Sequence, residues 1–162
     1  MLKQGQQLLS DHHVMRFVPW SKLRRDGDDN VLGFLPVAFE LRPTEEAISV
    51  NWLEYFPGDH QNQVTMCVGE FRDRGILTIG KKSAFGVANV RKVRDICNNN
   101  GRAIRIVYSP TPKNSHTLIQ KLPRDEFALY ETLAVEAFTE IIMNTQVPFG
   151  DADLAPCIPD VP

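Results

Sequence analysis

The sequence lacks the features of a disulfide scaffold, a zinc module or a membrane protein. It has only three cysteines, Cys67, Cys97 and Cys157, which are widely spaced and include no C-x-x-C. An odd, scattered set argues against a disulfide framework or a cysteine-based zinc site, and favours a reducing, cytoplasmic location. No apolar run approaches the ~20 residues that span a bilayer, and the N-terminus has no signal-peptide core.

The sequence also lacks the short motifs that mark common catalytic classes. It contains no G-x-G-x-x-G, no P-loop, no H-E-x-x-H and no G-x-S-x-G. The segment 26–30, Asp-Gly-Asp-Asp-Asn, starts like a calcium loop, but Val31 and Val37 stand where such a loop needs glycine and glutamate. We therefore expect neither a cofactor nor a metal.

The composition predicts one folded domain. The chain has 162 residues, of which 43% are hydrophobic and 23% charged, ordinary values for a globular protein that needs no cross-link to hold its core. Residues 1–143 are expected to form a single α+β domain. Residues 144–162 contain four prolines and no clear period, so we expect an extended or disordered tail.

The hydrophobic pattern predicts a four- to five-stranded mixed or antiparallel sheet, covered mainly on one face by three to four helices. Strands are expected at 13–18, 48–56, 76–79, 84–88 and 102–108, with 31–41 as an edge strand, a bent strand or a buried loop. Helices are expected at 64–71, at 89–97 with Asn89 as N-cap, at 115–122 and at 124–143. The helix at 124–143 carries the widest apolar face and should be the longest.

Charge is unevenly distributed, although the net charge is only −2. Between residues 76 and 122, Asp95 is the only acid, whereas residues 125–162 contain no lysine or arginine. Segments adjacent in sequence are usually adjacent in space, and Asn89 at a helix N-terminus adds possible backbone donors for an anion. The candidate anion-binding residues are Lys81, Lys82, Arg91, Lys92, Arg94, Arg102 and Arg105.

This pattern favours a small binding or regulatory protein that contacts an anionic or protein partner through a basic face at residues 81–105, rather than an enzyme. Nucleic acid or another polyanion is a possible partner. One alternative is that the basic middle pairs with the acidic C-terminal helix, within the fold or across a structural homodimer without small-molecule chemistry. A charge run can also be no more than a solvated surface.

A second alternative is a metal-independent phosphodiesterase or ribonuclease. His13 and His116, if the fold brings them together, would act as general base and general acid, because imidazole titrates near neutral pH. Arg16 would then hold the phosphate. No two histidines have the spacing i, i+3 or i, i+4, so a metal site on one helix is not expected.

Overall fold

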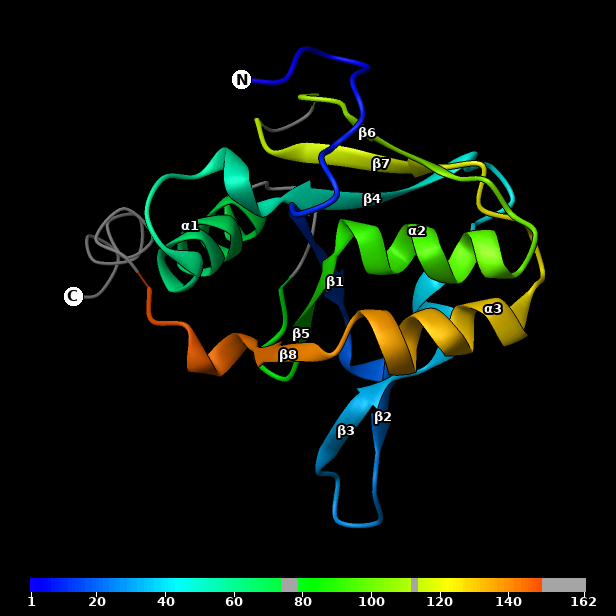
Figure 1. Ribbon diagram of the computed structural model, residues 1–162. Helices are drawn as coiled ribbons and strands as arrows, with labels where there is room; N and C mark the ends of the chain where they lie inside the picture. The colour runs from blue at the N-terminus through cyan, green and yellow to red at the C-terminus, as the bar shows by residue number, and fades with distance from the viewer. Residues whose placement is uncertain (74–78, 112–113, 150–162) are drawn as a thin grey trace.

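Six strands form one antiparallel sheet in the order β6-β7-β4-β1-β5-β8 (Figure 1). The computed structural model describes residues 1–73, 79–111 and 114–149. This result confirms the α+β class and the antiparallel arrangement, and adds a sixth strand to the expected sheet. The strands are β1 (His13–Val18), β4 (Ala47–Trp52), β5 (Ala84–Asn89), β6 (Arg105–Tyr108), β7 (His116–Gln120) and β8 (Glu140–Met143).

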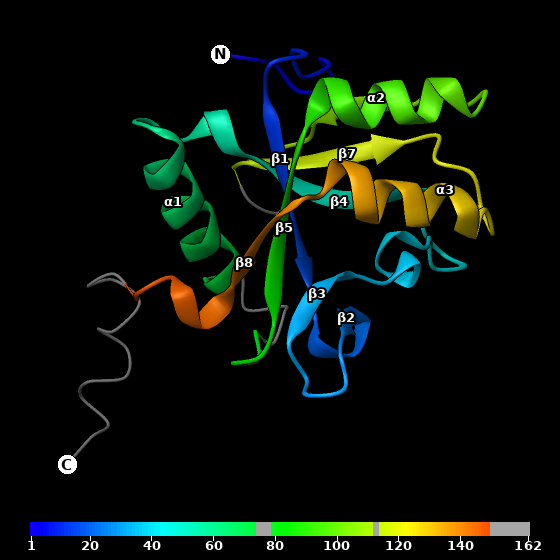
Figure 2. The ribbon, with the colours of Figure 1, turned by 60° about the horizontal axis from the view of Figure 1, so that its bottom comes forward.

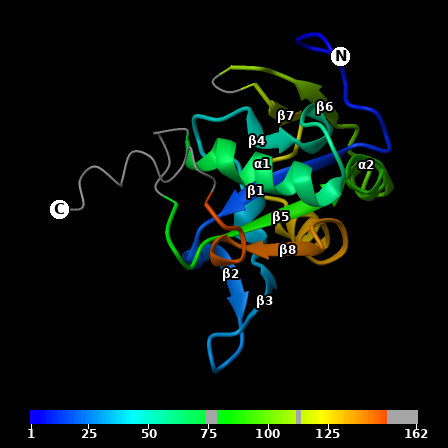
Figure 3. The ribbon, with the colours of Figure 1, turned by 90° about the vertical axis from the view of Figure 1, so that its left-hand side faces the viewer.

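Helices cover both faces of the sheet, not mainly one as expected (Figures 2 and 3). Helix α1 (His60–Arg72) packs on one face, where Met15, Phe85 and Val87 meet its apolar side. Helices α2 (Val90–Asn99) and α3 (Phe127–Thr132) pack on the other face. We call these two sides the α1 face and the α2–α3 face.

The two longer helices begin where their sequences provide a cap. The Asp59 side chain accepts a hydrogen bond from the Asn62 amide at the start of α1, and the Asn89 side chain accepts one from the Lys92 amide at the start of α2. Such caps satisfy amides that have no partner inside the helix. The helix predicted at 64–71 is confirmed, because the four apolar residues at the helical spacing are all buried: Val64, Cys67, Val68 and Phe71.

A two-stranded hairpin, β2 (Leu23–Arg25) and β3 (Val31–Phe34), projects from the body of the molecule (Figure 1). Its base is fixed by Phe34, whose ring lies directly over the backbone of Gly86 in β5. Five short helical turns complete the described fold: η1 (Trp20–Lys22), η2 (Pro36–Phe39), η3 (Leu53–Tyr55), the π-helical turn η4 (Leu133–Ala137) and η5 (Asn144–Gln146).

The prediction of a long C-terminal helix at 124–143 is wrong. The helix α3 covers only Phe127–Thr132, widens into η4, and ends at Phe138, whose φ of −87° and ψ of 65° leave the helical region. The chain then pairs with β5 as strand β8. The β-branched pair Ile141 and Ile142 suits a helical face and a strand equally well, and the open edge of β5 decides between them.

The prediction of a helix at 115–122 is also wrong. Residues His116–Gln120 form β7, which pairs with β4 on one side and with β6 on the other. Thr117 and Ile119 are β-branched and buried, as in a central strand. The strand expected at 76–79 lies almost wholly outside the described residues.

The start of the segment expected as a tail packs on α1. Val147 is buried in the same cluster as the apolar side of α1. The Arg72 guanidinium donates to the Asn144 carbonyl at 2.9 Å and to the Val147 carbonyl at 2.7 Å. The remainder of that segment, 150–162, lies outside the described residues.

Candidate functional site

The structure does not bring His13 and His116 together. Both lie on the α1 face, but β4 runs between their strands and the register offsets them by two residues. Standard strand spacing then puts their Cα atoms about 12 Å apart. The His116 ring is also fully engaged, with Nδ1 2.8 Å from the Ser109 carbonyl and Nε2 3.0 Å from Ser49 Oγ. The expected acid–base pair therefore has no shared site.

Arg16 lies on the opposite face of the sheet from His13, because residues three apart on a strand point to opposite sides. Its Nε donates to the Ala38 carbonyl at 2.6 Å, and its Nη1 donates to the Ser49 carbonyl at 2.8 Å. Desolvation lowers the pKa of Arg16 to about 10. Arg16 therefore ties η2 to β4, away from His13.

The candidate anion-binding residues are spread over the molecule. Lys81 and Lys82 precede β5 and the α2 residues follow it, so a six-residue strand of about 17 Å separates them. Arg105 lies on β6, at the other end of the sheet from β8. The basic residues therefore do not converge into one patch, because the length of β5 separates Lys81 and Lys82 from the basic residues of α2.

Two further members of this set already have partners. Arg94 donates to the Leu8 carbonyl at 2.7 Å, which ties α2 to the N-terminal segment, and desolvation lowers its pKa. Arg102 forms an ion pair with Glu126. The helix N-terminus at Asn89 is likewise used internally, since the first three amides of α2 donate to the His12 carbonyl, the Ser10 carbonyl and Asn89 Oδ1.

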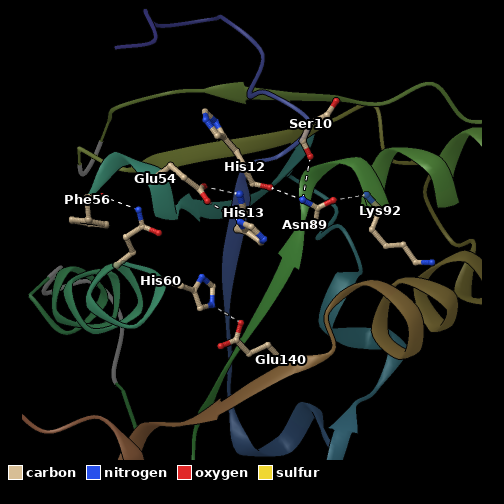
Figure 4. A network of polar contacts seen from close by, with 10 residues as sticks. Ser10, His12, His13, Glu54, Phe56, His60, Asn89, Lys92 and Glu140 are labelled. Atoms are coloured by element: carbon tan, nitrogen blue, oxygen red, sulfur yellow. Dashed lines mark hydrogen bonds and ion pairs between the residues drawn. The ribbon is translucent and has the colours of Figure 1, made fainter. Parts of the chain in front are cut away.

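What the structure does assemble is a pair of histidines, each held by a glutamate (Figure 4). His13 Nδ1 lies 2.7 Å from Glu54 Oε2, and the His13 amide donates to Glu54 Oε1 at 2.7 Å. His60 Nε2 lies 2.7 Å from Glu140 Oε1. The two imidazole rings meet edge to face, with their centroids 5.5 Å apart.

Sequence reasoning identified His13 but missed the other three members of this group. His60 stands in a polar break, Glu54 falls within the strand expected at 48–56, and Glu140 falls within the segment mistaken for a helix. One signal was available for His60, because the run Pro-Gly-Asp-His places it one residue after a capping aspartate. The position of Glu140 depends on β8 and could not be read from the local pattern.

An open cavity of about 470 Å³ lies beside this group. His13 and Glu140 form part of its wall, together with Asn89 and Lys92 at the start of α2 and Glu136 of η4. Its apolar lining is provided by Val87 and Ala137. Within the described part of the chain, no group of three or more His, Cys, Asp or Glu residues is placed to hold a metal ion.

A second cavity, of about 300 Å³, separates the hairpin from β8, and we call it the β3–β8 groove. Leu32 and Phe34 of β3 form one wall, and Val135, Phe138 and Ile141 form the other. Leu32 and Val135 are each 58% exposed. Exposed apolar side chains that face one another across a groove are typical of a contact surface for another chain.

The two edge strands of the sheet differ in whether another segment pairs with their outer side. At the β6 edge, the N-terminal segment runs alongside the strand: the Leu8 amide donates to the Ile106 carbonyl at 2.9 Å and the Tyr108 amide donates to the Gln6 carbonyl at 2.9 Å. At the β8 edge, none of the described residues pairs with the outer side of the strand. An uncovered edge is a template for an added strand.

Comparison with protein-family models, curated proteins and solved structures finds no match for this chain. Among the described residues, no helix has the length and apolar character needed to cross a membrane.

Proposed function

We propose that this protein is a binding protein that associates by strand addition at the β8 edge, and that its partner is a second copy of the chain. This retains the expected role in binding but moves the contact surface. Binding through a basic face at residues 81–105 stays a prediction, and the scattered positions of those residues do not support it.

The observation that carries the proposal is the backbone of Ile141. The Asn144 amide donates to the Ser83 carbonyl at 2.9 Å, so Asn144 faces β5. Backbone groups alternate along an antiparallel ladder; therefore Ile142 and Glu140 also face β5, whereas Ile141 and Met143 face outward. Ile141 thus presents both its amide and its carbonyl at the free edge.

Gln146 restricts the register that an added strand can take. Its side-chain oxygen Oε1 accepts a hydrogen bond from the outward Met143 amide at 2.9 Å. The outward groups left on β8 are then centred on Ile141. A second copy, related by a two-fold axis through this residue, would pair Ile141 with Ile141 and exchange two hydrogen bonds.

Side chains in this register are compatible with self-association. Glu140 of one copy would lie opposite Ile142 of the other, so no like charges meet directly across the new ladder. Ile141 points to the α2–α3 face and lines the β3–β8 groove. The pairing would place two such grooves side by side, where the exposed Leu32 and Val135 could be covered.

Sedimentation analysis of the full chain, with two edge variants and one control, tests the proposal. Ile141→Pro removes the outward amide without breaking the β5 ladder, and proline is tolerated where a strand amide faces solvent. Leu32→Lys places a charge in the groove. Leu9→Lys makes the same change at a residue that is 56% exposed and lies outside the groove.

We expect a dimer for the wild type and for Leu9→Lys, and a monomer for the two edge variants at the same concentration. For Ile141→Pro, losing two exchanged hydrogen bonds of about 0.5–1.5 kcal/mol each weakens association by roughly 5- to 150-fold. Circular dichroism must show an unchanged fold in all four proteins. A dimer that survives both edge variants would place the interface elsewhere.

A further inference from the structure

We infer that the cavity beside His13 and His60 is a metal-independent catalytic site for phosphodiester hydrolysis, with these two imidazoles as base and acid. This inference does not depend on self-association through β8.

Each ring has one nitrogen fixed by a carboxylate and one nitrogen free. Glu54 is hydrogen-bonded to His13 Nδ1, and Glu140 is hydrogen-bonded to His60 Nε2. His13 Nε2 and His60 Nδ1 have no hydrogen bond within the described part of the chain. A carboxylate on one ring nitrogen fixes the tautomer and leaves the other nitrogen to exchange a proton with a substrate.

Glu54 is a strong positioning residue for His13. Its two oxygens accept from the His13 ring and from the His13 backbone amide, both at 2.7 Å. The side chain is therefore held on the same residue by both oxygen atoms. Figure 4 shows Glu54, His13, His60 and Glu140 next to one another, and of these four residues His13 and Glu140 line the cavity.

The positions of the two rings divide their roles. His13 is part of the cavity wall, whereas His60 stands next to it and is not among the residues that line the cavity. His60 is more exposed, with 44% of its side chain accessible against 33% for His13, so we place the leaving group on the His60 side. His13 therefore acts as the base and His60 as the acid.

The reaction needs water as its only co-reactant. The water oxygen forms a bond to phosphorus while the bond from phosphorus to the leaving oxygen breaks. His13 Nε2 removes a proton from the attacking water, and protonated His60 gives its Nδ1 proton to the leaving alcohol. The products are a phosphomonoester and an alcohol, and proton exchange with solvent returns both imidazoles to their starting states.

The charges lining the cavity select a diester over a monoester. Glu140 is paired with His60, which leaves the ammonium group of Lys92 and the carboxylate of Glu136 without an ion pair among the described residues. One cation attracts the single negative charge of a phosphodiester. Glu136 opposes the second charge of a monoester, because like charges close together are unfavourable.

The test is hydrolysis of bis(4-nitrophenyl) phosphate by the full chain in the presence of EDTA. His13→Asn keeps a side-chain N–H where Nδ1 lies, and His60→Gln keeps one where Nε2 lies, so both variants can retain their glutamate partner. Neither can exchange a proton. We expect His13→Asn to lower kcat/KM by about 100-fold or more, the usual contribution of a base. His60→Gln should cause a loss of that size with a diester whose leaving group is an alkyl alcohol, and a smaller one here, because 4-nitrophenolate departs without a proton.

Two charge variants test the substrate class. Lys92→Met should raise KM for the diester by roughly two- to fivefold, whereas Lys81→Met, at the far end of β5, should not change it. Glu136→Gln should improve hydrolysis of 4-nitrophenyl phosphate relative to the diester. Absence of diester hydrolysis by the wild type, or activity that persists in both histidine variants, would overturn the inference.

Discussion

Replacing Gly86 with alanine tests how tightly the hairpin is fixed to the sheet. Gly86 is buried in β5, and its φ lies outside the left-handed region, so an alanine meets no backbone strain. A Cβ added there would lie 2.5 Å from Phe34 Cε2 and 2.8 Å from Phe34 Cζ. Ordinary carbon–carbon contacts are about 3.5–4.0 Å, so the Phe34 ring must move by about 1 Å.

Little space is available for that movement, since Phe34 is only 1% exposed. Forcing an extra carbon into a filled core costs about 1–3 kcal/mol. For a chain of this length, that loss lowers the Tm by roughly 2–12 °C. Without the contact, Gly86→Ala would be neutral or slightly stabilising, because alanine restricts the unfolded chain.

Urea unfolding of a double-mutant cycle measures the contact directly. Phe34→Leu removes the ring atoms that the new Cβ would meet, so Gly86→Ala should cost at least 1 kcal/mol less in that background. Gly27→Ala provides the matched control, because a Cβ at this hairpin-tip residue meets nothing within 4 Å. Equal effects of Gly86→Ala with and without Phe34 would refute the packing described for the hairpin.

Two further predictions concern the α2–α3 core and the C-terminal segment. Burial raises the pKa of Cys97 to about 11, which leaves about one thiolate in a thousand at pH 8. Because Cys67 is buried as well, a folded Cys157→Ser variant should take up no thiol label at pH 8, and prompt labelling of Cys97 would contradict its burial. Arg72→Lys cannot form the paired hydrogen bonds that hold Asn144 and Val147, so the free energy of unfolding should fall by about 1–3 kcal/mol. Unchanged stability and unchanged proteolysis near residue 147 would show that Arg72 does not fix this segment.

Local patterns were reliable where one face of an element is apolar and its ends carry a signal. The helix α1 has the expected apolar spacing, and α2 begins at the expected Asn89 cap. Strand β1 stops before a proline, as expected. In these segments, local preference and tertiary packing favour the same structure, so a single sequence is sufficient to predict the element.

The failures lie where pairing decides the outcome. Residues 140–143 fit the face of a helix as well as a strand, and only the free edge of β5 makes them β8. His116 was expected at the start of a helix, yet pairing of β7 with β4 places its ring between Ser49 and Ser109. Because β8 and η3 position Glu140 and Glu54, the site could not be assembled from sequence.

One part of the site prediction could have been excluded in advance. Once 13–18 is a strand, alternation places Arg16 on the face opposite His13. Arg16 could then not hold a phosphate beside that histidine. Alternation along a strand does not predict the position of His60, because that position depends on how α1 packs against the sheet.

Sedimentation velocity of the full chain, wild type against Ile141→Pro, tests the binding proposal most directly. We expect a concentration-dependent dimer for the wild type and a monomer with an unchanged circular dichroism spectrum for Ile141→Pro. A Kd of about 100 μM corresponds to a binding free energy of about −5.5 kcal/mol. A wild-type protein that stays monomeric at about 100 μM would contradict self-association through β8.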